Sequence, residues 1–252
     1  MEVGTSPRGA SPATVNTASP SVFIGTFGVV LALIAFFLVF DTFVARIDKD
    51  EARSRALNNY QEGMRLYDKG ELDAAVEQFS TAAAMDRENI VYRVALARVM
   101  VRAEDIVTAE ALLRSILQTD PTDGVANQLL AQVLVKQGHT EDAIAYYHRA
   151  VYGRWRAGEQ GSSLQARFEL INLLAATGAQ KALLAELLPI QDQSLNDLTM
   201  RDRIGFLFLE AGSPSRAADV FHQVIQKDAQ NARAYTGLGE ASLALGNYAV
   251  AE

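Results

Sequence analysis

The chain has 252 residues, 49% of them hydrophobic, with a formal net charge of -7 at pH 7 and a pI near 5.1. This acidic balance lacks the surplus of Lys and Arg that binding to a phosphate backbone requires, so we expect no nucleic acid partner. The absence of cysteine excludes disulfides, thiolate nucleophiles and Cys-ligated metals. The three histidines, His139, His148 and His222, have no metal-binding spacing, so we expect no metal and no cofactor.

Residues 1–20 consist mainly of Ser, Thr, Pro, Ala and Gly. Such a segment cannot bury enough apolar surface to offset the entropy lost on ordering, so we expect a disordered tail. Residues 22–40 then read VFIGTFGVVLALIAFFLVF, without a charged residue over 19 positions. A helix of this length crosses a hydrocarbon core of about 30 Å. The sequence therefore predicts a transmembrane helix over residues 21–45, in contact with the lipid bilayer.

A cleaved signal peptide is the alternative for this apolar segment. The run is longer than the usual signal core, and a cut after Ala45 would place bulky Phe43 where a small residue is needed. We therefore favour an uncleaved anchor, which makes this a membrane protein of the single-pass type.

One face of the predicted transmembrane helix carries small residues: Gly25, Gly28, Ala32 and Ala35. Small residues let helices approach closely in lipid, which would suit packing against another transmembrane helix. Gly is also frequent in such helices in general, so a specific partner helix stays an open alternative.

Residues 46–55 are expected to form a helical connector, because Glu51 and Arg55 make a favourable i,i+4 pair and no Pro or Gly interrupts the segment. Basic residues are more numerous after the span than before it, where only Arg8 stands. The positive-inside rule then places the following residues in the cytoplasm, by a slight margin. Nearby acidic residues dilute this signal, and the side of the membrane stays open.

From residue 56 onward the sequence repeats itself. Turn positions separated by 34, 34, 40, 34 and 34 residues are Gly70, Glu104, Gly138, Gly178, Gly212 and Gly246. Seven residues before the turns the residue is small in five of six cases: Gly63, Ala97, Ala131, Ile171, Gly205 and Gly239. Nine residues after the first five turn positions the residue is large: Phe79, Leu113, Tyr147, Leu187 and Phe221. Small positions let two antiparallel helices cross closely, and glycine reaches the left-handed conformation that a turn between them needs.

This pattern resembles the tetratricopeptide repeat family, whose unit is a helix-turn-helix of 34 residues. The resemblance covers about residues 56–252 and is closest in the stretch ARAYTGLGEASLALGNYAVAE. It implies an all-α fold in which a single N-terminal transmembrane helix precedes a right-handed helical solenoid of about five and a half repeats. Repeats one to three would occupy residues 56–157 and repeats four to six residues 164–252, with a linker insertion over 158–163.

Several residues depart from the family pattern. Glu62 and Arg87 replace an expected leucine and proline, Leu183 replaces an alanine, and Pro189 should shorten or kink the second helix of repeat four. With the insertion, these departures suggest two lobes of three repeats with a looser joint between them. The sixth repeat ends early, and we expect the native protein to continue past Glu252 or to meet a partner there.

In this family the first helices of the repeats line a concave face that holds peptides or partner helices. Counting positions within the repeats assigns ten residues to this groove: Tyr60, Met64, Tyr67, Arg98, Arg102, Gln128, Gln132, Lys136, Gln165 and Asn172. The groove would have an aromatic mouth and a cationic, amide-rich middle suited to an acidic or amide-rich segment. An ordinary solvated face is the alternative. The lysine and asparagine clamp of some relatives is not supported, because Tyr60 and Met64 occupy its first positions.

The only tryptophan lies in the sequence Arg154, Trp155, Arg156. Trp and Arg are enriched at interface hot spots, so this triplet is a potential surface anchor for a partner. Packing of the indole beneath its own loop is the alternative.

These features favour a membrane-tethered adaptor or scaffold that binds protein partners, in the assembly or maintenance of a membrane complex. The alternative is a permanent structural accessory subunit of a larger membrane complex. An enzyme is not expected, because no nucleophile and base constellation is visible. The sequence does not identify the partner.

Overall fold

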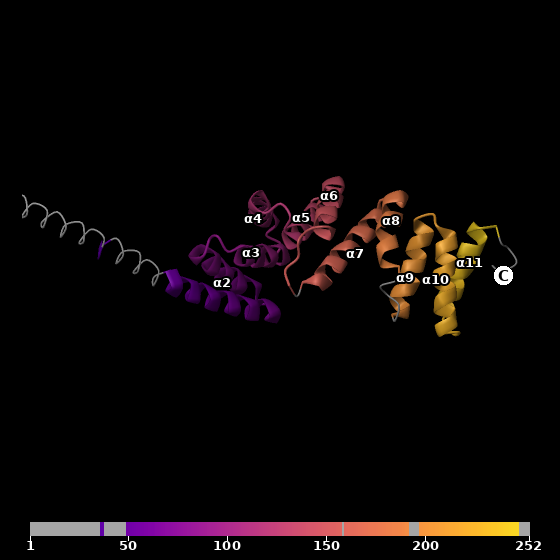
Figure 1. Ribbon diagram of the computed structural model, residues 1–252, viewed down its shortest axis with the longest axis horizontal. Coiled ribbons are helices and arrows are strands. Elements are labelled where there is room, and N and C mark those ends of the chain that lie inside the picture. The colour runs from indigo at the N-terminus through magenta and orange to yellow at the C-terminus, as the bar shows by residue number, and fades with distance from the viewer. Residues whose placement is uncertain (1–35, 38–48, 158, 192–196, 247–252) are drawn as a thin grey trace, which may run out of the picture. The chain divides into compact units, whose positions relative to one another are not determined.

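The computed structural model describes residues 36–37, 49–157, 159–191 and 197–246 (Figure 1). The expected tail (1–20), the packing face at Gly25 to Ala35 and nearly all of the expected transmembrane helix (21–45) lie outside these residues. Within the described ranges, no helix is both long and apolar enough to cross a membrane. The chain divides into two units, residues 1–55 and 56–252.

In the first unit, residues 49–55 are helical, as expected for the connector, and Arg55 Nε lies 3.9 Å from Glu51 Oε1. The second unit consists of helices, and residues 56–69 are helical as well. The helices that follow are α2 (Leu72–Met85), α3 (Ile90–Arg102), α4 (Ile106–Thr119), α5 (Gly124–Lys136), α6 (Thr140–Val151), α7 (Gln160–Ala176), α8 (Gln180–Leu187), α9 (Leu198–Glu210), α10 (Pro214–Lys227) and α11 (Ala232–Ala244).

Neighbouring helices form antiparallel pairs, one pair per repeat. Each helix from α2 to α11 packs against the next one in the chain, and Figure 1 shows this succession. Contacts also join helices two apart, namely α3 with α5, α5 with α7 and α9 with α11. These are all first helices of their repeats, and a hydrogen bond from Arg203 of α9 to Asn172 joins α9 to α7. The first helices from α3 to α11 therefore lie beside one another and form one face. The all-α solenoid expected from the period is confirmed.

Side-chain caps fix the starts of four first helices, whereas α7 has none. Asn89, Asp123, Asp197 and Asn231 each accept a hydrogen bond from a backbone N–H in the first turn of α3, α5, α9 and α11, respectively. Such caps satisfy N–H groups that have no partner within the helix, and each is worth about 1 kcal/mol. Local sequence therefore decides where these helices begin.

The turns between paired helices adopt the left-handed conformation that the repeat pattern predicts. Positive φ angles occur at Gly70, Gly138, Gly178, Gly212 and Gly246. Glu104 stands at the same point of repeat two and adopts φ of 63° although it is not a glycine. The geometry of the helix pair thus overrides the preference of the residue, at a cost of about 1 to 2 kcal/mol.

This conformation makes Gly138→Ala a clean measure of backbone strain, because a Cβ atom at Gly138 would meet nothing within 4 Å. We expect the substitution to lower the free energy of unfolding by about 1 kcal/mol through the φ of +78° alone. Gly138→Asn should cost less, since Asn enters the left-handed region more readily. Urea unfolding of the three proteins would measure this, and equal stability of all three would contradict it.

The large residues after each turn fill the space that the small residues leave. Phe79 packs against Gly63 of its own repeat, and a Cβ atom on Gly63 would lie 2.8 Å from the ring. Phe221 packs against Gly205 of its own repeat and against Gly237 of the next one. Sequence reasoning missed Gly237, although its position on a first helix, facing the preceding repeat, required a small residue.

Two expectations about repeat four are tested by the helix bounds. Pro189 does shorten the second helix: α8 ends at Leu187, and a 3-10 turn, η1 (Leu188–Ile190), follows it. The linker expected over 158–163 is mostly helix, because α7 begins at Gln160. The core also continues past this segment, since Tyr146 and Leu173 pack against the buried clusters on both sides. Packing therefore continues across this segment, and the looser joint between two lobes stays a prediction.

Candidate functional site

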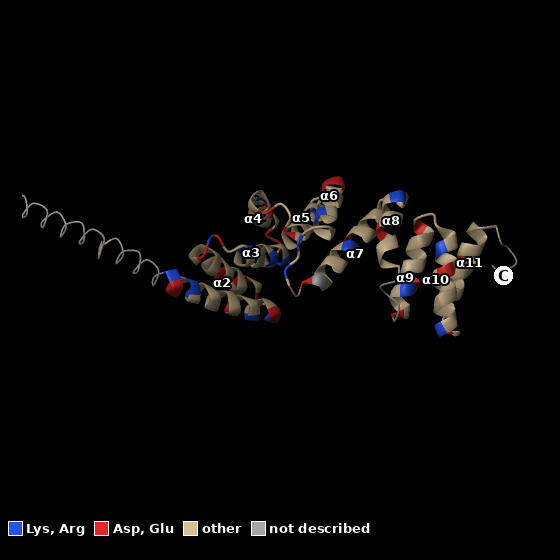
Figure 2. Ribbon diagram, viewed as in Figure 1, with Lys and Arg blue, Asp and Glu red and all other residues tan. Residues whose placement is uncertain are grey.

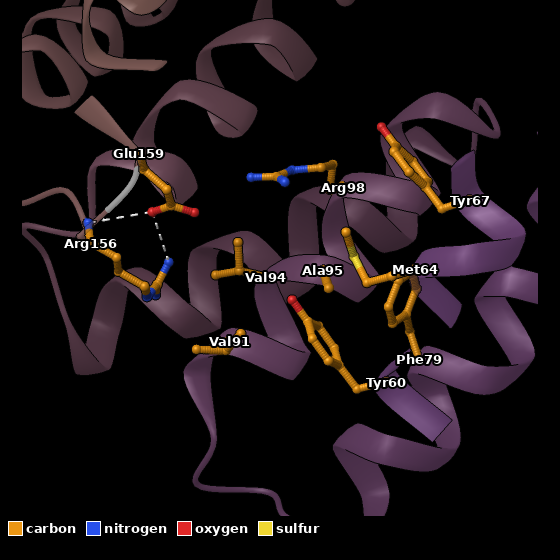
Figure 3. A pocket seen from close by; sticks show the side chains of 10 residues that line it. All are labelled: Tyr60, Met64, Tyr67, Phe79, Val91, Val94, Ala95, Arg98, Arg156 and Glu159. Carbon is orange, nitrogen blue, oxygen red and sulfur yellow. Dashed lines mark hydrogen bonds and ion pairs between the residues drawn. The ribbon is translucent and has the colours of Figure 1, made fainter. Parts of the chain in front are cut away.

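A pocket lies on the first-helix face where repeats one and two meet the segment that follows α6 (Figure 3). Tyr60, Met64 and Tyr67 come from the first helix of repeat one, and Arg98 comes from α3. The other lining residues are Phe79, Val91, Val94, Ala95, Arg156 and Glu159. The four groove residues expected here are thus brought together, with apolar side chains between them.

The rim of this pocket contains two arginines, of which Arg156 forms ion pairs and Arg98 does not, among the residues that the structure describes. Arg156 Nη1 lies 3.7 Å from Glu159 Oε2, and Arg156 Nη2 lies 2.6 Å from Asp123 Oδ2. Arg98 is half-buried, and within the described residues it makes no hydrogen bond or ion pair. In Figure 3 its guanidinium extends across the pocket in the direction of Glu159. The pocket therefore offers an apolar surface beside one uncompensated cation.

Residues 152–157 hold the wall of the pocket in place through a backbone contact with the start of α5. Arg154 N–H donates to Thr122 O at 2.7 Å, and Gly124 N–H donates to Arg154 O at 2.9 Å. Arg154 also pairs with Asp120. Burial raises the pKa of Asp120, but hydrogen bonds from Thr122 and Arg154 outweigh it and hold that pKa below its ordinary value. The aspartate is thus kept ionised for the pairing.

Trp155 packs inward instead of forming an exposed anchor. Its indole lies against Gly124, where a Cβ atom would be 2.5 Å from the ring, and its Nε1–H donates to Ala150 O at 2.8 Å. Packing beneath the loop, the alternative left open by the sequence, is what the structure has. The Arg154, Trp155, Arg156 triplet attaches the loop to α5, and of the three only Arg156 reaches the pocket.

The expected cationic, amide-rich middle of the groove is occupied by the protein's own side chains. Gln128, Gln132 and Gln165 all donate to the carboxylate of Glu169 on α7, at 3.1, 2.9 and 3.0 Å. Lys136 Nζ lies 2.5 Å from Glu104 Oε1. Sequence reasoning missed Glu169, although its i,i+4 spacing from Gln165 was a signal that one amide had a local partner.

The two remaining groove residues also have partners. Arg102 Nη1 donates to Tyr67 O at 3.2 Å, and its guanidinium lies 4.7 Å from the Tyr67 ring centroid. Asn172 Oδ1 accepts from Arg203 Nη2 at 2.5 Å. Of the cations expected to meet a partner, Arg98 alone is not paired within the described part of the chain. The centre of the candidate site therefore moves from repeats two and three to repeats one and two.

Comparison with known families identifies the repeat. Two family models, both described as tetratricopeptide repeat, match residues 60–124 and residues 101–153 with 208–252, and together they span more than half of the chain. The chain belongs to the tetratricopeptide repeat family. No curated protein sequence matches this tetratricopeptide repeat protein.

Solved structures share the fold of this tetratricopeptide repeat protein at low sequence identity. A tetratricopeptide repeat protein from Parabacteroides merdae has a TM-score of 0.54 and 16% identity, over 79% of this chain and 76% of its own. PilF of Pseudomonas aeruginosa has a TM-score of 0.56 and 16% identity, over 81% and 88%. YrrB, described as having an unusual peptide-binding site, has a TM-score of 0.52 and 19% identity, over 76% and 95%. Identities this low establish the fold alone.

Proposed function

We propose that this protein is a membrane-tethered adaptor that holds a segment of a protein partner on its first-helix face, with the pocket at Tyr60, Met64 and Arg98 as the main contact. The observation that carries this proposal is the half-buried Arg98, which has no hydrogen-bond or ion-pair partner among the described residues and lies beside apolar surface. Partial burial of a guanidinium without an acceptor costs free energy. A ligand that supplies an acceptor would compensate for this cost.

The chemistry of the pocket limits what the partner presents. Met64, Val94 and Ala95 offer apolar contacts to one side chain, and the Arg98 guanidinium offers several N–H donors to a carbonyl or carboxylate next to it. Tetratricopeptide repeat proteins commonly bind peptides or protein partners on stacked helix faces, which supports a peptide segment as the ligand. YrrB has a peptide-binding site on the same fold.

The tether is proposed from the sequence. Residues 22–40 are uncharged, and a helix over 21–45 would place the repeats close to the bilayer. Basic residues are more numerous after this span than before it, which favours the cytoplasmic side for the repeats by a slight margin. An adaptor held there would act on partners at the membrane, in assembling or maintaining a membrane complex. Protease accessibility in sealed vesicles would test the side, and recovery of the full chain in the soluble fraction would contradict the tether.

A charge reversal in the pocket tests the adaptor function. We expect Arg98→Glu to reduce partner recovery at least tenfold when the tagged full chain is purified in mild detergent. A carboxylate of the partner would then face the like charge of the introduced carboxylate, and a carbonyl of the partner would lose its hydrogen-bond donor. Arg149→Glu is the matched control, since Arg149 is exposed on the second helix α6. Circular dichroism and thermal melting would verify that both variants fold.

Equal recovery of partners by Arg98→Glu and Arg149→Glu would contradict the proposed pocket. Proteins recovered at one fixed ratio in both variants would point instead to a permanent structural subunit, whose attachment does not depend on the pocket.

A further inference from the structure

A second set of first-helix residues lies in repeats four to six, away from the pocket. Here two arginines lie on aromatic rings of the preceding first helix. Arg203 of α9 is 5.8 Å from the ring centroid of Phe168 on α7, and Arg233 of α11 is 5.1 Å from that of Phe206 on α9. We call Phe168, Asn172, Arg203, Phe206 and Arg233 the arginine stripe.

The stripe is continuous across three first helices. Arg203 and Phe206 are three residues apart on α9 and therefore lie on the same side of that helix. α9 and α11 contact one another, so Arg233 continues the same face. Arg203 and Arg233 are exposed residues, in contrast to the half-buried Arg98.

The positive charge of the stripe has no acidic partner among the side chains that the structure describes. Lys136 in repeat three pairs with Glu104, and Arg167 on α7 pairs with the buried Glu186 at 2.9 Å. For Arg203 and Arg233 no carboxylate lies within ion-pair distance among the residues that the structure places. Within the described ranges, Arg203 donates one hydrogen bond, to the neutral amide of Asn172, and this amide does not compensate its charge.

Contact with the aromatic rings also restricts the conformations of the two arginine side chains. A guanidinium that lies over a ring can still donate from N–H groups along its edge, and these donors match the two oxygens of a carboxylate. In Arg203 one of them, on Nη2, already donates to Asn172. Phe206 is itself fixed by Phe221, with ring centroids 5.0 Å apart. Less side-chain entropy is therefore lost when a carboxylate binds than would be lost at a freely rotating surface arginine.

We propose that the arginine stripe is a second docking surface, and that it binds an acidic extended segment of a protein partner through carboxylates placed on Arg203 and Arg233. Charge complementarity selects this partner, because the stripe offers two cations for which the described residues supply no carboxylate partner. The protein as a whole is acidic, with a net charge of -7, so general electrostatic attraction does not bring an acidic segment to it. The surface goes beyond the proposed pocket, because it lies on different repeats.

The test uses the purified full chain in mild non-ionic detergent and a fluorescent octaglutamate peptide, with octaglutamine as the neutral probe. We expect octaglutamate to bind in fluorescence anisotropy at about 0.1 M salt and to be released at about 1 M, where the Debye length falls from about 10 Å to about 3 Å. Arg203→Gln with Arg233→Gln should weaken binding at least tenfold. Lys181→Gln with Arg216→Gln, which removes two exposed cations from the second helices α8 and α10, should change it less than twofold.

Two results would overturn the proposal: no binding of octaglutamate by the unmodified chain at low salt, or equal weakening by the two double variants. Octaglutamate binding that depends on Arg98, with Arg203 and Arg233 dispensable, would also overturn it while leaving the adaptor function standing. The converse, loss of octaglutamate binding in the stripe variant with unchanged partner recovery in the Arg98→Glu variant, would support the stripe and contradict the pocket.

Discussion

Phe221→Ala is expected to lower the free energy of unfolding by about 3 to 5 kcal/mol, the range for a fully buried Phe replaced by Ala. The Phe221 ring has no exposure and fills the space between Gly205 and Gly237. Because both neighbours are glycines without side chains that could move inward, the cavity left by the ring would collapse only in part. Urea unfolding followed by circular dichroism would measure the change.

Two further variants make this expectation specific. Tyr235→Ala removes an aromatic ring from the same part of the chain, but Tyr235 is 50% exposed, so its cost should stay below about 1 kcal/mol. Gly237→Ala would place a Cβ atom 2.2 Å from Phe221 Cζ, and the cost of this substitution should fall when Phe221 is replaced by Leu. Additive effects of Phe221→Leu and Gly237→Ala would contradict the proposed packing.

Gly124→Ala is the second large effect expected, and it acts on the wall of the pocket. In a helix, Ala is normally more stable than Gly by about 1 kcal/mol. Here a Cβ atom would lie 2.5 Å from Trp155 Cε2, so the indole has to move. We expect a net loss of about 1 to 3 kcal/mol, the usual cost of overpacking. Trp155 is the only tryptophan, so a red-shifted emission and stronger iodide quenching would report its displacement directly.

Gly161→Ala is the matched control for this substitution. Gly161 also lies in a first helix, α7, but a Cβ atom there meets nothing within 4 Å. It should leave the emission of Trp155 unchanged and should stabilise the helix slightly. An unchanged emission spectrum in Gly124→Ala as well would mean that the indole does not depend on the absence of a side chain at residue 124.

The hydrogen bonds and ion pairs within the candidate site show what position counting could not predict about the groove. Position counting placed all ten residues on first helices, but it gave no information about which of them already had partners. Glu169 and Glu104 come from other repeats or turns, and they take up the glutamines and the lysine of the middle repeats. Pairing across repeats depends on side-chain reach between helices, which a single repeat does not encode.

The sequence by itself determined the repeat, because its period, its small positions and its turn glycines are local requirements of packing two helices closely. It also determined the helix starts through residues such as Asp123, and the early end of α8 through Pro189. Only the tertiary structure decided that Trp155 faces inward on Gly124 and that residues 160–163 join α7. It also decided that Lys136 pairs with Glu104, whereas Arg98 has no such partner in the described part of the chain. These outcomes depend on atoms brought together from distant parts of the chain, and their free energies come from contacts that no local pattern records.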